Sequence, residues 1–140
     1  MIALDSSVIV AALTSWHRKR EAAAAAVEKA LGSRSGVIIP IHALLEAYSV
    51  MTRIPAPFRL LPAEAWELLS RNFAHVRLAM LPASSIWPLL AALSSADLGG
   101  DITYDAAILA AAESAGASAL LTFNVRHFER LRPHIRIEEP

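Results

Sequence analysis

Residues 99–128 read GGDITYDAAILAAAESAGASALLTFNVRHF, and the pattern within them indicates the fold class. The alanine-rich run over residues 104–115 predicts a helix that ends before Gly116. Residues 118–122, SALLT, then predict a short buried strand, and residues 124–130 predict a short helix or turn. A helix that leads directly into a short apolar strand is typical of a parallel sheet covered by helices.

The N-terminal residues 1–10, MIALDSSVIV, contain a strand, a turn and the start of a helix. The apolar run 1–4 stops at Asp5, Ser6 and Ser7 follow, and residues 8–13 are compatible with a helix. Further helices are predicted over residues 21–31, 41–53, 63–73 and 84–95, and further strands over residues 37–39, 76–81 and 134–137. This alternation predicts an α/β fold: a single three-layer domain over residues 1–140, with a parallel central sheet of about five short strands flanked by helices.

The composition fits one compact domain and points to a protein partner. The chain has 140 residues, formal net charge +0 and no cysteine, which excludes disulfide frameworks and cysteine-bound zinc. Hydrophobic residues make up 55% of the chain and charged residues 19%, below the roughly 25% charged residues of ordinary domains. We therefore expect part of the apolar surface to meet another subunit or a partner chain.

An uncharged stretch over residues 78–96 has nearly the length of a membrane-spanning helix. Pro82 and Pro88 interrupt this stretch, and four serines dilute its hydrophobicity. The N-terminus lacks the basic region of a signal peptide, and Asp5 falls within what would be its apolar segment. We expect a cytoplasmic protein that does not enter a membrane.

Three acidic residues lie at positions where a charged side chain calls for an explanation. Asp5 ends a buried strand, Asp105 lies in the first turn of an almost wholly apolar helix, and Glu46 lies in the helix over residues 41–53. Each also has a structural interpretation. Asp5 could cap the following helix, Asp105 could complement its helix dipole, and Glu46 could pair with His42 one turn away.

The combination of these acids points to a divalent cation. Side chains at the carboxyl ends of parallel strands gather at one edge of the sheet, where carboxylates repel one another unless a hard cation lies between them. Mg²⁺ or Mn²⁺ fits oxygen ligands of this kind. Zinc is disfavoured because the chain has no cysteine, no HExxH motif and no pair of histidines at helical spacing. The five histidines are scattered, and each is expected to be a surface or structural residue.

Two other α/β classes with acids at strand ends fit less well. A response-regulator receiver domain needs a lysine after its last strand, whereas the only lysines here, Lys19 and Lys29, lie early in the chain. A phosphatase with an aspartyl nucleophile needs a DxD motif, and Ser7 occupies the second acidic position.

Three segments in order, MIALDSSVIV at 1–10, PIHALLEAYSVMTRIPAPFRLLP at 40–62 and the stretch at 99–128, resemble PIN-domain ribonuclease toxins of the VapC type. The resemblance implies a PIN-like fold and a divalent-metal-dependent endoribonuclease, the toxin of a type II toxin–antitoxin pair, which hydrolyses RNA phosphodiesters with metal-activated water. The catalytic residues and metal ligands would be Asp5, Glu46 and Asp105, which match the family's motif positions. The cofactor would be Mg²⁺, with Mn²⁺ able to substitute.

Asn124 departs from the family pattern, because many PIN domains carry an aspartate at this position. The amide binds a cation more weakly and adds no charge, so the alternative function is a catalytically impaired PIN-like module that binds RNA or protein. Asp101, one turn before Asp105, could compensate by holding metal-bound water. The residues expected to support the ligands or contact RNA are Ser6, Ser7, Asp101, Thr122, Asn124 and Arg126.

The resemblance also implies partners: a cognate antitoxin, an RNA substrate and a second copy of the chain in a homodimer. Residues 54–62, IPAPFRLLP, predict a rigid apolar connection beside the Glu46 helix that could clamp a partner helix. Arginines gathered near the C-terminus, Arg126, Arg130, Arg132 and Arg136, are expected to contact phosphates. The three tryptophans, Trp16, Trp66 and Trp87, are expected in the core, with Trp16 as a further candidate for lining the partner groove.

Overall fold

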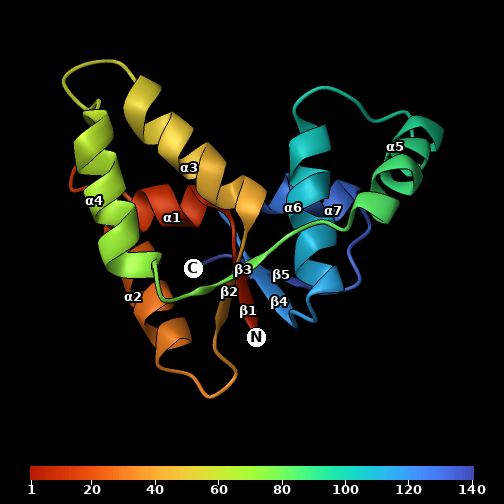
Figure 1. The fold of residues 1–140 in the computed structure, drawn as a ribbon, viewed down its shortest axis with the longest axis horizontal. Coiled ribbons are helices and arrows are strands. Elements are labelled where there is room, and N and C mark those ends of the chain that lie inside the picture. The colour runs from red at the N-terminus through yellow and green to blue at the C-terminus, as the bar shows by residue number, and fades with distance from the viewer.

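The computed structural model describes all 140 residues and contains five strands and seven α-helices (Figure 1). The strands are β1 (Ile2–Leu4), β2 (Val37–Pro40), β3 (Arg77–Ala79), β4 (Ala119–Leu121) and β5 (Arg136–Glu138). The helices are α1 (Ser6–Leu13), α2 (Arg20–Leu31), α3 (Ile41–Arg53), α4 (Pro62–Phe73), α5 (Ile86–Ser95), α6 (Ile102–Ser114) and α7 (Val125–Arg130), with a short 3₁₀ turn at Ala83–Ser85.

All five strands belong to one parallel sheet with the order β3-β2-β1-β4-β5. The chain starts in the middle strand, runs outward through β2 and β3, and then crosses to the other side of β1 to form β4 and β5. The strand order therefore reverses between β1 and β4. In open α/β sheets, ligands bind outside the carboxyl ends of the strands at such a switch point.

Helices cover both faces of the sheet, which confirms the predicted three layers (Figure 1). One core of 17 buried residues joins one face of the sheet to α1, α2, α3 and α4. A second core of 11 buried residues joins the opposite face to α6 and α7. Small side chains such as Ala47 and Ala112, both 0% exposed, allow the helices to approach the sheet closely. Figure 1 shows α5 on the outer side of α6.

The strands and helices lie where the sequence predicted them, with shifts at the ends. The strand expected over residues 76–81 spans only Arg77–Ala79, and the helix expected over 84–95 is divided into the 3₁₀ turn and α5. Pro88 is accommodated in the first turn of α5, where proline costs no helical hydrogen bond. None of the helices combines the length and the hydrophobicity needed to cross a membrane.

The expectation of buried tryptophans is wrong. Trp16, Trp66 and Trp87 are 39%, 68% and 79% exposed. The buried stripe of α4 is Ala65, Leu69 and Phe73, so Trp66 lies on the flank of that stripe. The tryptophan rings thus lie outside the core, whose aromatic residues are Phe73 and Phe128.

Residues 54–61 form the loop between α3 and α4, and Phe58 in this loop is 45% exposed. Its ring lies against Trp16 with a centroid separation of 4.9 Å. The apolar surface expected from the composition is thus present, at this loop and around Trp66 and Trp87.

Candidate active site

Asp5 lies at the switch point of the sheet because it directly follows the central strand. Its backbone N–H donates to the carbonyl of Leu121 at 3.0 Å, which continues the β1–β4 pairing by one residue. The residue is 1% exposed and is also the N-cap of α1. Asp5 therefore caps α1, as the structural interpretation predicted, and it does so at the edge of the sheet where the site was predicted.

One oxygen of the Asp5 carboxylate receives most of the hydrogen bonds. Its Oδ2 accepts from the Ser7 backbone N–H at 3.3 Å, the Ser7 hydroxyl at 2.6 Å and the Thr122 hydroxyl at 2.8 Å. The Oδ1 atom has a single long contact, 3.4 Å from the Ser6 hydroxyl. The expected bond from a neighbouring serine is thus present, and Oδ1 keeps the capacity to accept a further partner.

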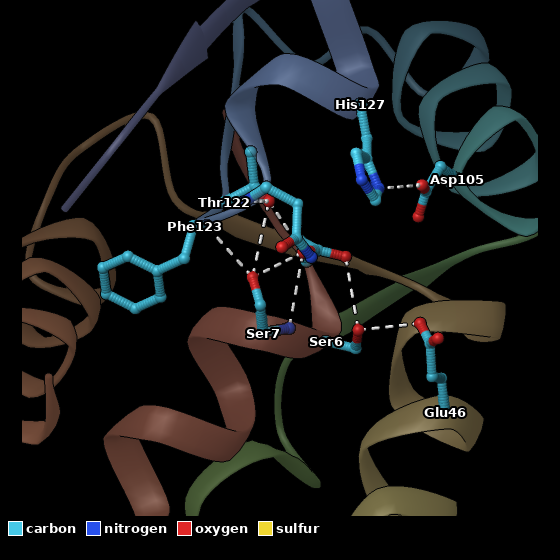
Figure 2. A network of polar contacts seen from close by, with 9 residues as sticks. Ser6, Ser7, Glu46, Asp105, Thr122, Phe123 and His127 are labelled. Carbon is cyan, nitrogen blue, oxygen red and sulfur yellow. Dashed lines mark hydrogen bonds and ion pairs between the residues drawn. The ribbon is translucent and has the colours of Figure 1, made fainter. Parts of the chain in front are cut away.

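Ser6, the first residue of α1, forms a hydrogen bond to Glu46 in α3. Its hydroxyl donates to Glu46 Oε2 at 2.7 Å, a contact between residues 40 positions apart (Figure 2). The alternative interpretation, in which Glu46 pairs with His42, is wrong: none of the three ion pairs of the structure joins these two residues. The His42 ring instead stacks on Tyr104 with centroids 4.9 Å apart.

Asp105 comes from the first turn of α6 and faces the same edge of the sheet. Its side chain is 14% exposed, and its Oδ2 lies 3.2 Å from His127 Nδ1 in α7 (Figure 2). Burial raises the pKa of Asp105, and the negative charges of Asp5 and Glu46 raise it further, against the opposing effect of His127. Asp105 therefore lies close enough to Asp5 and Glu46 for their negative charges to disfavour its ionised form.

The donor set suits a hard divalent cation. No group of three or more aspartate, glutamate or histidine side chains has ready-made metal-binding geometry. Mg²⁺, however, is usually held by one or two carboxylates and keeps several waters, which bridge to further oxygens. The carboxylates of Asp5 and Glu46 repel that of Asp105, and Asp5 Oδ1 can accept a further partner. These features fit such a cation in charge and in ligand chemistry.

Two hollows flank the acids, and Glu46 and Asn124 line both of them. The first, which we call the basic hollow, has a volume of about 480 Å³ and includes His17, Arg18 and Lys19. The second, the aromatic hollow, has a volume of about 500 Å³ and includes His42, Tyr104 and Arg53. Glu46 and Asn124 therefore lie where the two hollows meet.

The basic hollow was not predicted. Burial lowers the pKa of His17, and the adjacent positive charges of Arg18 and Lys19 lower it further. Lys19 pairs with Glu139 at 2.9 Å and lies 4.3 Å from the centre of the Phe123 ring. The run WHRKR at residues 16–20 is the signal that could have revealed this hollow.

The C-terminal arginines do not form the common patch that was expected. Arg130 and Arg132 line a different hollow between α5 and α6, and Arg136 pairs with Glu138 at 2.9 Å. Only Arg126 lines a hollow together with Asn124 and His127. The four arginines lie close together in the sequence, but this spacing could not show that their side chains line different surfaces of the protein.

The remaining predicted residues lie around the acids in different ways. Thr122 is fully buried and bonds Asp5, whereas Asp101 is exposed and lines the aromatic hollow. The Asn124 backbone N–H donates to the Thr122 hydroxyl at 2.9 Å, and its side chain is exposed between the hollows. His127 was expected to be a surface or structural residue, and its contact with Asp105 follows from the docking of α7 beside α6.

The fold and the site together define a class of proteins: the PIN domains. The family model described as PIN domain matches residues 2–132, and the chain belongs to this family. It is 39% identical over 140 residues to the protein named Ribonuclease VapC40 from Mycobacterium tuberculosis, covering 98% of each chain.

Solved structures share the fold at lower identity. The DNA-bound VapBC of Salmonella typhimurium has a TM-score of 0.71 at 22% identity, over 99% of this chain and 96% of that one. VapC20 of Mycobacterium tuberculosis, described as a toxin that cleaves the sarcin–ricin loop, has a TM-score of 0.70 at 16% identity, over 91% and 92% of the two chains.

Proposed function

We propose that this protein is a Mg²⁺-dependent endoribonuclease that acts as the toxin of a toxin–antitoxin pair. The observation that carries the proposal is the convergence of Asp5, Glu46 and Asp105 at the switch point of the sheet. The 39% identity to a ribonuclease over nearly the whole chain supports RNA as the substrate. The VapBC relative supports an antitoxin partner.

Each acid has a neighbour that fixes its orientation. Ser7 and Thr122 hold Asp5, Ser6 holds Glu46, and His127 faces Asp105. Residues that orient ligands in this way typically change metal affinity or activity by about 10- to 100-fold when removed. The three carboxylates would hold Mg²⁺, which supplies Lewis acidity and lowers the pKa of a bound water.

The basic hollow is the candidate site for the RNA backbone. Arg18 is exposed and takes part in none of the three ion pairs, so its guanidinium is available to a phosphate. The chain as a whole has net charge +0, and local positive charge beside the acids is therefore what favours RNA there.

Replacing Arg18 by serine should raise the KM for RNA about three- to tenfold and reduce the slope of log KM against log salt by about 1, because one phosphate contact is lost. The measurement is steady-state cleavage at several salt concentrations. Arg34→Ser is the matched control, since Arg34 is exposed in the turn before β2, at the opposite edge of the sheet. Equal effects of the two substitutions would contradict the assignment of the basic hollow.

The partners belong to the same proposal. Large side chains remain exposed on several helices, including Leu45 at 62%, Trp66 at 68% and Trp87 at 79%. Apolar surface of this kind supports association with an antitoxin and with a second copy of the chain.

The experiment that tests the function is incubation of cellular RNA with purified, antitoxin-free protein in Mg²⁺, in Mn²⁺ and in EDTA. We expect discrete cleavage products that require the metal and are absent with Asp5→Asn and Asp105→Asn. Equal cleavage in EDTA or by the variants would contradict the metal mechanism. If no RNA is cleaved under any condition, a melting temperature that rises with Mg²⁺ or Mn²⁺ indicates a selective nuclease whose RNA was absent, and a melting temperature that does not change with metal supports the alternative of a non-catalytic binding module.

A further inference from the structure

Tyr104 and His42 form a stacked aromatic pair beside the acids. Their ring centroids are 4.9 Å apart and their planes differ by only 6°. Tyr104 directly precedes Asp105 in α6, and His42 lies one turn before Glu46 in α3. The pair is therefore fixed by the same two helices that carry two of the three acids.

Tyr104 keeps an accessible surface although it is stacked. The residue is 52% exposed, and a ring with one face against a parallel neighbour presents its other face and its edge. A tyrosine ring packed only for stability would be expected to bury most of its area. We call the exposed ring with its support the Tyr104 platform.

The surroundings of the platform are polar. Ser49, Arg53 and Asp101 line the aromatic hollow together with Asp105 and His127, and only two of its ten lining residues are hydrophobic. An apolar peptide finds few contacts in such a hollow. A flat ring with hydrogen-bonding edges can stack on Tyr104 and use the polar side chains at its rim.

We propose that the Tyr104 platform stacks one unpaired RNA base next to the phosphate that is cleaved, so that the site selects single-stranded RNA. The inference rests on the proposed ribonuclease function and adds a subsite to it. A base inside a duplex has both faces covered by its neighbours and cannot occupy the platform. The basic hollow, on the other side of Glu46 and Asn124, would take the adjoining backbone.

The test uses short RNA strands that carry 2-aminopurine, a base whose fluorescence is quenched by stacking on an aromatic ring. All proteins carry Asp5→Asn so that the probe stays intact. We expect quenching with single-stranded probes. Tyr104→Leu should weaken binding about tenfold and abolish the quenching, whereas Tyr104→Phe should retain both, because base–aromatic stacking depends on the ring.

Tyr48→Leu is the matched control, since Tyr48 is an exposed tyrosine of α3 that lines neither hollow. It should bind like the parent. Equal binding and quenching by Tyr104→Leu and its parent would overturn the platform, as would equal quenching of single-stranded and duplex probes.

Failure of the platform and failure of the nuclease give different results. A protein that cleaves RNA but shows no quenching through Tyr104 retains the proposed function and loses the platform. A second outcome is a protein that cleaves no RNA in Mg²⁺ or Mn²⁺ but quenches the probe with Tyr104 or with phenylalanine at position 104, and not with leucine there. That outcome retains the platform as a binding subsite and excludes the nuclease.

Discussion

Replacing Asp5 by asparagine should reduce RNA cleavage by about 10³-fold or more. Stabilisation of transition-state charge by a bound metal is worth several kcal/mol, and about 1.4 kcal/mol corresponds to a factor of ten in rate. Asparagine has nearly the same shape, caps helices well and keeps an oxygen for Ser7 and Thr122. We therefore expect a variant that folds but does not turn over, as measured by initial cleavage rates and by thermal unfolding of the same samples.

The matched control for this substitution is Asp97→Asn. Asp97 is exposed between α5 and α6 and has a φ of 54°, a conformation that asparagine also tolerates. Its variant should cleave RNA at the parent rate. If Asp5→Asn also cleaves within a few-fold of the parent, Asp5 is a helix cap and not a metal ligand.

Replacing Asp105 by asparagine should abolish cleavage to a similar extent and, without metal, should make the protein more stable at neutral pH. Burial first, and then the charges of Asp5 and Glu46, raise the pKa of Asp105 above its usual value. The folded protein therefore holds this proton to a higher pH than the unfolded chain does. The stability that Asp105 contributes is complete below the usual pKa of aspartate and is lost as the pH rises through the raised pKa.

Thermal unfolding in EDTA between about pH 3.5 and pH 7.5 measures this effect, since the lower limit lies near the usual pKa of aspartate. The melting temperature of Asp105→Asn should exceed that of the parent by a few degrees at pH 7.5, and the difference should shrink as the pH falls. Added Mn²⁺ should stabilise the parent and not the variant. A variant that melts below its parent at pH 7.5 would contradict the proposed repulsion among the acids.

The fold could be predicted because its signals are local. The strands β1, β2 and β4 are apolar and bounded by a polar residue or by glycine or proline, and α3 and α4 each bury every fourth residue along one face. The positions of Asp5 and Thr122 then followed from topology, since parallel strands bring their carboxyl ends to one edge. The hydroxyl contacts of Ser7 could be expected because Ser7 is only two residues from Asp5.

The features that could not be predicted depend on how distant elements pack. His127 reaches Asp105 only because α7 docks beside α6, and Ser6 reaches Glu46 across 40 residues. Similarly, Tyr104 stacks on His42 because α3 and α6 approach each other at the edge of the sheet. Trp66 and Trp87 are exposed because the buried residues of α4 and α5 lie on other sides of these helices, and hydrophobicity alone does not indicate that side.

The most direct test of the metal-dependent nuclease is a single titration with two readouts. EDTA-treated protein, freed of chelator, is titrated with Mn²⁺, and both the melting temperature and the rate of RNA cleavage are followed. If Asp5, Glu46 and Asp105 hold the catalytic cation, cleavage is absent at the start. The melting temperature then begins to rise at the Mn²⁺ concentration at which cleavage is half-maximal, because stabilisation grows as RT ln(1 + [Mn²⁺]/Kd). Cleavage by the metal-free protein would contradict the account. So would a Mn²⁺-induced rise in melting temperature that is the same in Asp105→Asn as in the parent, because the metal would then bind elsewhere.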